Sequence, residues 1–435
     1  MKIYYYPSRA AEKRVADIVH RGLSFKKKDF QAVSKILEDV RRNGDQAVVK
    51  YTKKFDAPRI SVAKMKVTAK ELDAASKTVD RTFVRALNRA ASQIKAFHHQ
   101  QVRRSWMSTE RPGTVLGQLI NPADAVGVYI PGAKGGKTPL VSTVLMTAIP
   151  ARIAGVGKIV MVTPPTREGG VNPYLLMAAK KVGIKDIYKA GSAWGIAALA
   201  YGTETIPKVD VIVGPGNIYV TLAKKIVSGT VGIDMIAGPS EVLVIADETA
   251  SPEFAAADLL SQAEHDILSS AILITHSEKT ARAVAHEVEK QLVNLTRREI
   301  AGKSLARFGA VIVVRDSKTA IDLANRIAPE HLELHMDDPF EVVEQIRNAG
   351  AVFLGHYTPE PVGDYVAGPS HVLPTGGTAR FSSALSVDHF IKKTSIIHYS
   401  PKAFRREASD VMRLAEIEGL DAHVRSMQVR LERGS

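Results

Sequence analysis

Hydrophobic positions along the chain follow two different periods. Up to about residue 110 they recur at three- and four-residue spacing with charges between them, which predicts helices over 29–54 and 69–103. From Ala123 onward the pattern changes to short β-branched runs, each followed by a Gly or Pro turn and an Ala/Leu-rich helical stretch. This alternation predicts parallel βαβ units with right-handed connections.

The strand–helix alternation occurs in two consecutive cycles. Strands are predicted at 125–130, 158–163, 186–190 and 209–213 in the first cycle, and at 242–246, 271–275, 310–314 and 351–354 in the second. Helices are predicted between and after them, at 140–154, 173–182, 193–201, 218–227, 252–264, 279–295, 319–327 and 339–349. We therefore expect an α/β protein with two Rossmann-like parallel sheets, a helical N-terminal segment and a helical C-terminal tail at about 403–433.

Composition narrows the chemistry. The 435 residues are 45% hydrophobic, enough for a substantial core, and include no cysteine. Disulfide frameworks, thiolate zinc sites, iron–sulfur clusters and a cysteine nucleophile are thereby excluded, so any metal must use nitrogen and oxygen ligands.

Charge and hydropathy bear on the cellular compartment and on the kinds of partner to expect. The N-terminus lacks the apolar core of a signal peptide, and no stretch has about 18 uninterrupted apolar residues, so we expect a soluble cytoplasmic protein without a membrane partner. The net charge is +14, but Lys and Arg are spread along amphipathic helices without an aromatic-interleaved stripe or a nucleic-acid-binding motif. We expect no nucleic-acid partner, and a basic surface could equally attract an anionic dinucleotide.

A Gln and a His near the end of an apolar helical run are candidate metal ligands. If this stretch is helical, Gln262 and His265 stand on one face, where both could reach one cation. The alternative is a solvated helix edge. Asp364 in a turn and His423 in the tail would complete a set of two nitrogen and two oxygen ligands, which zinc accepts, although a glutamine oxygen is an unusual member.

The stretch 328–334 carries adjacent acid and imidazole groups. Pro329 directs Ala328 away from helical conformation, so Glu330 and His331 are expected where the chain leaves a helix and enters a short strand. His331 suits proton abstraction from an alcohol and Glu330 suits activation of water. The alternative is a surface Glu beside a half-buried His.

Two loops at predicted strand ends could hold an anionic ligand. The segment 131–138 comes close to a phosphate-binding loop, but Pro131 replaces its first glycine and Pro139 follows its threonine, so a small-anion or dinucleotide loop stays open beside a triphosphate site. In 213–217, two glycines allow close backbone approach, and Asn217 is suited to cap the next helix. A complete dinucleotide-binding fingerprint is missing, so a dinucleotide would be held in an atypical way.

Taken together, these separated motifs resemble the histidinol dehydrogenase family from about Tyr4 to Arg430. The most specific stretches are 127–146, 213–224, 231–247, 259–266, 328–334, 363–383 and 418–423. The resemblance implies an NAD-dependent oxidoreductase that converts L-histidinol through L-histidinaldehyde to L-histidine, the last step of histidine biosynthesis. It further implies one Zn²⁺ per subunit and two NAD⁺ consumed per turnover.

The resemblance also assigns roles to individual residues. Catalysis falls to Glu330 as the residue that activates water and to His331 as the acid–base residue. The matched zinc ligands are Gln262, His265, Asp364 and His423. The matched substrate contacts are Ser240, Gln262, His265, His331, Asp364, Glu418 and His423, and the matched NAD contacts are Tyr129 and Asn217.

A domain organisation follows from the same resemblance. We expect an N-terminal helical arm over 1–25, a first Rossmann-like domain with the catalytic and zinc residues over 26–128 and 242–385, and a second, NAD-contacting one over 129–241. The tail, 386–435, is expected to reach the partner subunit of a homodimer whose active site is shared across the interface.

One departure and two rivals accompany this interpretation. Trp194 stands where the family often has a cofactor-contacting Gln, and its indole could stack on a ring or fill the groove. A family relative acting on another amino alcohol or a sulfonated diol would keep the Glu330–His331 pair, and a zinc hydrolase would use Glu330 without NAD.

Overall fold

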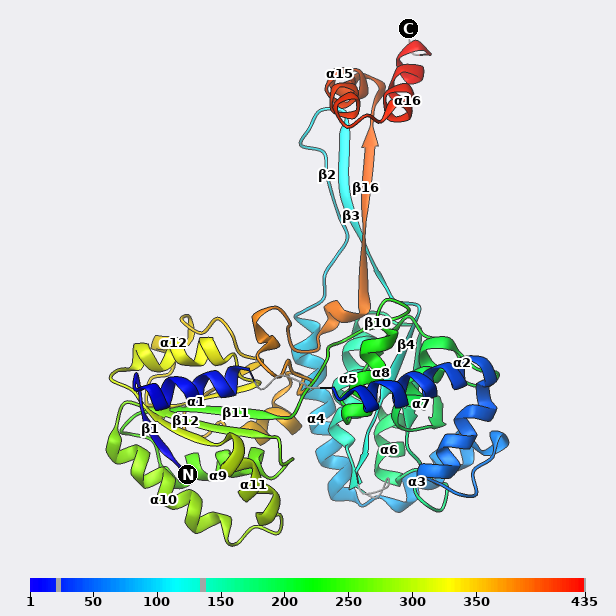
Figure 1. The fold of residues 1–435 in the computed structure, drawn as a ribbon. Helices are drawn as coiled ribbons and strands as arrows, with labels where there is room; N and C mark the ends of the chain where they lie inside the picture. Colours follow the sequence, from blue (N-terminus) through cyan, green and yellow to red (C-terminus); the bar gives the residue numbers. More distant parts are fainter. Residues whose placement is uncertain (21–24, 134–137, 434–435) are drawn as a thin grey trace. The chain divides into compact units, whose positions relative to one another are not determined.

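The computed structural model describes residues 1–20, 25–133 and 138–433. The chain forms two compact units, each built from separate stretches of sequence (Figure 1). The first comprises 1–101 and 123–390, and the second comprises 102–122 and 391–435.

A six-stranded parallel sheet forms one half of the first unit. Its strand order is β1 (Ile3–Tyr5), β13 (Ala310–Val313), β12 (Ser270–Thr275), β11 (Glu241–Ala246), β14 (His331–His335) and β15 (Ala351–Leu354). On one face, Val242 and Val244 pack with the helices α9 (Pro252–Ala263), α10 (Glu278–Leu292) and α11 (Arg298–Phe308). On the other, Leu243 and Ile245 pack with α1 (Arg9–Val19) and α12 (Ser317–Ile327). The result is a three-layer α/β arrangement.

Alternation along β14 places the chemistry on one face of this sheet. Leu332 and Leu334 belong to the core beneath α12. Because successive side chains of a strand point to opposite faces, His331, Glu333 and His335 lie on the side of α9.

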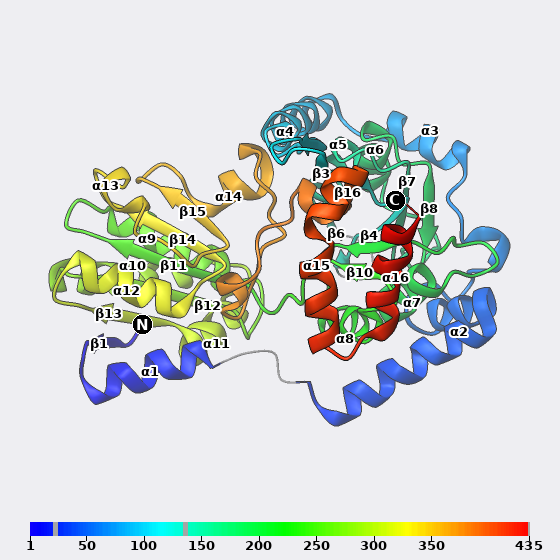
Figure 2. The same ribbon diagram turned by 90° about the horizontal axis from the view of Figure 1, so that it is seen from above.

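A five-stranded parallel sheet forms the other half of the first unit. Its order is β10 (Gly232–Ile233), β9 (Val211–Val213), β4 (Ala125–Tyr129), β7 (Lys158–Thr163) and β8 (Asp186–Lys189). One face is covered by α2 (Lys27–Phe55), α7 (Ser192–Tyr201) and α8 (Ile218–Val227), and the other by α3 (Ala69–Thr78), α4 (Arg81–His99), α5 (Val141–Ile153) and α6 (Pro173–Lys181). The two helical layers lie on opposite sides of the strands in Figure 2.

The predicted α/β class with two Rossmann-like parallel sheets is confirmed. The expected grouping of 26–128 with 242–385 differs from the observed packing. The apolar faces of α2, α3 and α4 pack on α7, α6 and α5, and β4 pairs with β7 and β9, so this stretch belongs with the five-stranded sheet. The expected N-terminal helical arm contains α1 but begins with a strand, β1, which pairs with β13.

The second unit is a three-stranded antiparallel sheet followed by two helices. Its strands are β2 (Trp106–Ser108), β3 (Thr114–Pro122) and β16 (Ile391–Tyr399), and its helices are α15 (Pro401–Ile417) and α16 (Asp421–Glu432). The helical tail predicted at about 403–433 consists of these two helices, which are separated at Gly419, whose φ of +69° is unfavourable for other residues. The expected tail domain therefore also includes 102–122, because β3 pairs with β16 along its whole length.

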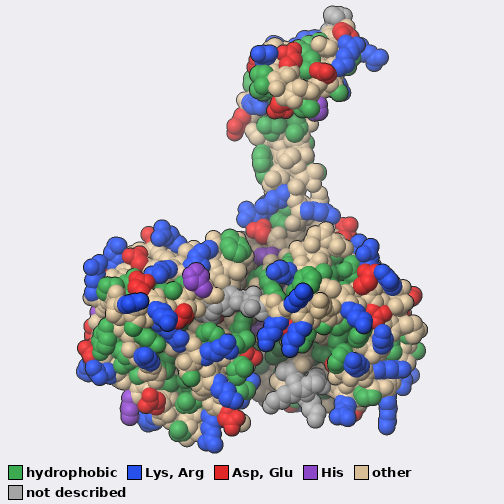
Figure 3. All heavy atoms as spheres, in the orientation of Figure 1, with side chains coloured by type: hydrophobic (Ala, Val, Ile, Leu, Met, Phe, Trp, Pro, Cys, Tyr) green, Lys and Arg blue, Asp and Glu red, His purple; other side chains and the backbone are tan. Residues whose placement is uncertain are grey.

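On the face of the first unit in Figure 3, Lys and Arg side chains are interspersed with Asp and Glu. Among the helices that the structure describes, none combines the length and apolar character needed to cross a membrane.

Candidate active site

Glu330 directly precedes β14, and His331 is the first residue of this strand, which follows α12 after a short turn. Ala328 caps α12 in a left-handed conformation with φ of +52°, and Pro329 stops the helix from continuing. The predicted exit from a helix into a short strand is confirmed. Both side chains are buried, so the alternative of a surface Glu is wrong.

The main chain fixes the protonation state of His331. Its Nδ1 atom lies 2.9 Å from the main-chain oxygen of Glu241, which can only accept a hydrogen bond, so Nδ1 carries the proton. Its Nε2 atom is buried and has no hydrogen-bond partner in the described part of the chain. Burial lowers the pKa of His331 to about 4, so the ring is neutral and Nε2 presents a lone pair.

Gln262 lies beside the same ring, at the end of α9. Its Nε2 atom is 3.0 Å from Nδ1 of His331, and it could donate there only if that atom were unprotonated. With the proton on Nδ1, both atoms are donors, and this contact is not a hydrogen bond. Its Oε1 atom is fully buried and is unpartnered among the described residues.

Glu330 and Glu241 hold each other in place. The Glu241 N–H donates to Oε2 of Glu330 over 2.9 Å, and the Glu330 N–H donates to Oε2 of Glu241 over 3.2 Å. Burial raises the pKa of Glu330 well above its ordinary value, and repulsion from Glu241 is the second largest cause of this rise. A carboxyl of this kind can gain and lose a proton closer to neutral pH than an exposed Glu.

A pair of carboxyl groups adjoins His331. Asp364 lies in a π-helical turn, Gly363–Ala367, directly after the short helix α14 (Glu360–Val362). Ligand atoms of His331, Glu360 and Asp364 all lie within 4.8 Å of one another. Burial and the neighbouring Asp364 raise the pKa of Glu360 to about 8, and burial raises that of Asp364 to about 6.

Sequence reasoning missed Glu360. The spacing of two carboxyl groups four residues apart, Glu360 and Asp364, was the signal that could have found it. His371 extends this cluster, since its Nδ1 lies 3.9 Å from Asp364 Oδ1 and its Nε2 lies 3.2 Å from Thr143 Oγ1.

The other predicted residues of this region lie at exposed or half-buried positions. His265 is exposed in the turn that follows α9, and its N–H donates to the main-chain oxygen of Gln262 over 3.2 Å. Ser240 is half-buried directly before β11, and its main-chain oxygen accepts the N–H of Ser270.

A second group of predicted residues lies at the strand ends of the five-stranded sheet. Tyr129 ends β4, and its hydroxyl accepts the N–H of Ser192 over 3.0 Å. Asn217 caps α8, as predicted, by accepting the N–H groups of Tyr219 and Val220. Gly214 has φ of +118°, and a Cβ there would lie 2.2 Å from the main-chain oxygen of Tyr129, so only glycine fits this loop.

In the predicted anion-binding loop, Gly136 and Lys137 lie outside the described residues, and Thr138 belongs to the short strand β6 (Thr138–Pro139).

Comparisons with known proteins identify the family. The histidinol dehydrogenase family model matches residues 20–431. The chain belongs to the histidinol dehydrogenase family. It is 56% identical to the histidinol dehydrogenase of Desulfotalea psychrophila over 92% of each chain, and 52% identical to that of Carboxydothermus hydrogenoformans over 92% of this chain and 93% of the relative. The crystal structure of histidinol dehydrogenase from Elizabethkingia anophelis superposes with a TM-score of 0.93 at 40% identity, covering 100% of this chain and 98% of the other.

The metal expected in a histidinol dehydrogenase fits the donors that the first unit provides. Oε1 of Gln262 is a buried polar atom that the described hydrogen bonds leave unsatisfied. Asp364 and Glu360 place two carboxyl groups beside His331, the neighbour of Gln262, and a divalent cation would relieve the repulsion that adds to burial in raising the pKa of Glu360. Imidazole, carboxylate and amide oxygen are donors that Zn²⁺ accepts.

Glu418 and His423 lie in the second unit. Glu418 is the C-cap of α15 and His423 lies in the first turn of α16, and both are exposed. Their predicted roles in the zinc and substrate sites stay predictions.

The departure from the family pattern at Trp194 has a structural explanation. The indole is 4% exposed and stacks between Tyr51 and Phe55, with centroid distances of 6.0 and 5.5 Å. Its Nε1–H donates to Oγ1 of Thr52 over 3.0 Å. Trp194 therefore fills the groove between α2 and α7, which was one of the two expected possibilities.

Proposed function

We propose that this protein oxidises L-histidinol to L-histidine through L-histidinaldehyde, with one Zn²⁺ per subunit and two NAD⁺ consumed. Membership of the histidinol dehydrogenase family supports the substrate. The observation that carries the chemistry is the buried His331, whose Nε2 has no partner among the described residues and whose ring lies beside Gln262 and the Glu360–Asp364 pair.

The overall reaction requires two hydride transfers and one addition of water at a single carbon. The alcohol first loses a hydride to NAD⁺ and its hydroxyl proton to a base, giving the aldehyde. Water then adds to the aldehyde carbon, giving a proton to a base while the carbonyl oxygen takes up a proton, and the resulting hydrate loses a hydride to a second NAD⁺ and a hydroxyl proton to a base, giving the acid. The cofactor supplies hydride acceptance, and the protein must supply bases at the right atoms.

His331 is the proposed base for both oxidation steps. Nδ1–H is held by the Glu241 carbonyl, so the proton from the alcohol, and later from the hydrate, is received at Nε2. The low pKa keeps the ring in the unprotonated form that this role needs at neutral pH.

Glu330 is the proposed base for the water step. Its raised pKa makes it a stronger base than an ordinary carboxylate, and its position next to His331 lets the two groups address different atoms of one substrate. The Glu241 N–H fixes the carboxyl at Oε2.

Gln262, His265, Asp364 and His423 are the proposed zinc ligands, and these residues together with Ser240, His331 and Glu418 are the proposed substrate contacts. When bound, the metal would supply a Lewis-acid template for the nitrogen atoms of the substrate. Tyr129 and Asn217 are the proposed NAD contacts, because the loop at Gly214 brings backbone and the α8 N-terminus together there.

A shared active site in a homodimer is part of the proposal. The second unit carries Glu418 and His423 and exposes large apolar side chains, which monomeric proteins seldom display in such number. Those more than half exposed are Trp106, Met107, Ile397, Leu414 and Ile417.

The test is the absorbance of NADH formed from L-histidinol and NAD⁺, measured before and after chelation and again after Zn²⁺ is restored. We expect two NADH per histidinol, loss on chelation and recovery with Zn²⁺. No nicotinamide reduction would favour a zinc hydrolase, and faster turnover of another amino alcohol or a sulfonated diol would favour a divergent substrate.

A further inference from the structure

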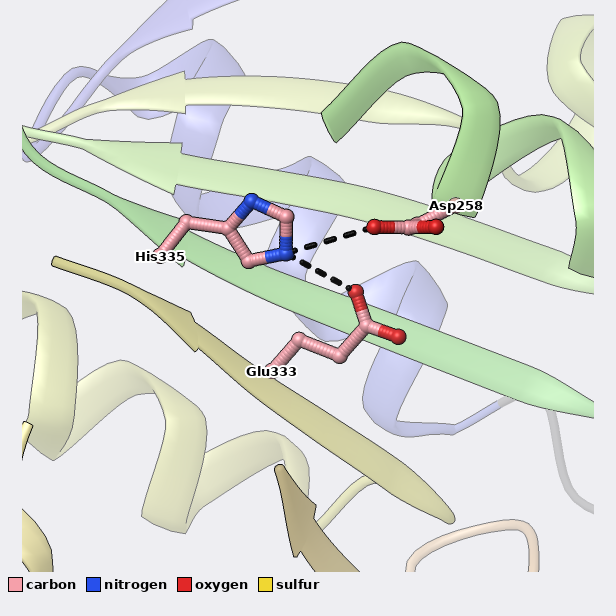
Figure 4. A group of neighbouring side chains, drawn as sticks. All are labelled: Asp258, Glu333 and His335. Carbon is pink, nitrogen blue, oxygen red and sulfur yellow. Dashed lines mark hydrogen bonds and ion pairs between the residues drawn. The ribbon is translucent and has the colours of Figure 1, made fainter. Parts of the chain in front are cut away.

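A second cluster of ionisable side chains lies behind the proposed active site. Asp258 on α9 and Glu333 and His335 on β14 are buried together (Figure 4). Nε2 of His335 lies 3.3 Å from Asp258 Oδ2 and 3.2 Å from Glu333 Oε2, so one imidazole nitrogen serves two carboxylates. No step of the proposed reaction uses these groups.

Two members of the cluster lie four residues from proposed active-site residues on the same elements. Asp258 precedes Gln262 by four residues, about one turn of α9, and His335 follows His331 by four residues on the same face of β14. The remaining oxygen of Glu333, Oε1, accepts the N–H of Glu360 over 2.8 Å. Glu360 opens the segment that carries Asp364.

Three elements that carry proposed site residues therefore meet at one charged cluster. We propose that Asp258, Glu333 and His335 form a positioning triad, which ties α9, β14 and α14 together and so holds the proposed ligands Gln262 and Asp364 and the proposed base His331 in their positions. This inference rests on the proposed function, because the residues it positions are the proposed ligands and base.

Charge explains why all three members are needed. Burial alone would lower the pKa of His335, but Asp258 and Glu333 overcome it and raise the pKa to about 9. A protonated His335 offsets one of the two negative charges, whereas its removal leaves two carboxylates facing each other in a buried environment. The same loss would release the restraint that Glu333 places on the Glu360 main chain.

A second metal ion at this cluster has less support. In Figure 4 both carboxylates converge on Nε2 of His335, whereas Nδ1 lies on the opposite side of the ring. The geometry matches a shared N–H donor to Oδ2 of Asp258 and Oε2 of Glu333, while Nδ1 of His335 is buried without a partner among the described residues.

The test compares variants in two measurements on the full-length protein. Glu333→Ala removes the contacts to His335 and Glu360, His335→Leu removes the shared donor, and His335→Gln retains N–H donors at the same position. Asp45→Asn is the matched control, because Asp45 is also a buried acid of the first unit but accepts hydrogen bonds from Thr203 and Thr205.

The first measurement is zinc affinity, determined by competition with a chelator. Loss of groups that orient metal ligands typically costs about 10–100-fold in affinity, and we expect that loss for Glu333→Ala and His335→Leu. We expect His335→Gln, which keeps an N–H donor but not the charge, to lose less affinity than His335→Leu, and Asp45→Asn to match the wild type. Unchanged affinity in Glu333→Ala, or equal losses in the two His335 variants, would overturn the triad.

The second measurement is hydrogen exchange at the Glu360 amide, which needs no zinc. Exchange should accelerate in Glu333→Ala and stay slow in Asp45→Asn. A wild type that binds no zinc but shows a protected Glu360 amide would contradict the proposed function while leaving the structural restraint intact. Two zinc ions per wild-type subunit, with one lost in the triad variants, would instead identify the cluster as a metal site.

Discussion

The Nδ1 atom of His331 lies 2.9 Å from the main-chain oxygen of Glu241, and this contact decides which ring nitrogen can act as a base. A carbonyl accepts a hydrogen bond whatever side chain its residue carries, so the tautomer is set by the fold of β11 beside β14. Nε2 is therefore the ring nitrogen that keeps a lone pair, and it is the proposed base of both oxidation steps.

Separate roles for His331 and Glu330 predict different kinetic defects. His331→Asn should slow histidinol oxidation and histidinaldehyde oxidation alike, by about 10²–10⁴-fold, because one base serves both. Glu330→Gln should slow chiefly aldehyde oxidation. Stopped-flow measurement of NADH from each substrate checks this.

His98→Asn is the matched control for the first variant, since His98 is also a fully buried histidine, with Nδ1 2.8 Å from Gln101 and no role in the site. Equal losses for both substrates in Glu330→Gln would contradict the division of roles.

Trp194 is predicted to support the fold rather than the cofactor. Trp194→Phe keeps an aromatic ring between Tyr51 and Phe55 but loses the hydrogen bond to Thr52, so it should lower the free energy of unfolding by about 1 kcal/mol. KM for NAD⁺ should change by less than about twofold, because the Trp194 indole is not expected to contribute to NAD⁺ binding. Tyr129→Phe is the comparison. It should raise KM for NAD⁺ clearly while lowering the Tm only slightly. A large rise of KM in Trp194→Phe would show that the indole contacts the cofactor.

A shared active site predicts complementation between inactive subunits. His265→Ala and His423→Ala should each lose zinc and activity alone. If the site takes His265 from one subunit and His423 from its partner, random reassociation of the two variants restores about a quarter of the intact sites. Recovered activity and zinc content measure this fraction. Mixing His265→Ala with Asp364→Ala should restore none, and recovery there would contradict the shared site.

The raised pKa of His335 predicts a stability difference that depends on pH. The folded-state pKa of about 9 exceeds the ordinary value of 6.5, so protonation stabilises the fold fully below pH 6.5, and this contribution is lost as the pH rises through 9. The groups facing the ring are Asp258, Glu333 and His356. The Tm of wild type minus that of His335→Gln should therefore be largest below pH 6.5 and smallest above pH 9. A gap independent of pH would mean that His335 is not charged in the folded protein.

The parallel sheets could be predicted because their strands are short apolar runs with helices on both faces. The expected strand at 242–246 corresponds to β11, which differs by one residue. Boundaries set by single side chains were harder to predict. The expected helix over 69–103 is divided at Asp80, which caps α4 through the Phe83 N–H, and the helix expected over 339–349 is reduced to α13 (Phe340–Val343).

The antiparallel strands of the second unit could not be predicted from hydrophobic pattern. Most residues of β16 are exposed, and its stretch Lys392–Thr394 reads as polar surface without an apolar face. Its pairing with β3 joins segments more than 250 residues apart, as in Tyr399 opposite Thr114. The local sequence of β16 does not indicate which distant strand it pairs with.

The candidate site could be predicted where its residues are adjacent in sequence. It could not be predicted where a main-chain atom, and not a side chain, makes the contact. Glu330 and His331 follow a proline that marks the turn into β14, so their position could be inferred. Glu241 contributes a main-chain oxygen to His331, a role that any residue type could fill. Asp258 joins Glu333 and His335 only because α9 packs over β11 and β12, next to β14, which the order of residues along the chain does not reveal.

Strand β14 carries ionisable groups on one face and leucines on the other, which limits what length changes this part of the chain can accept. Insertion or deletion of a single residue between Pro329 and Glu333 would turn Leu332 toward α9 and bring imidazole and carboxyl groups into the apolar core under α12. Such a change would abolish chemistry and folding together. Homologues should therefore vary in length on either side of this strand while keeping the number of residues within it constant.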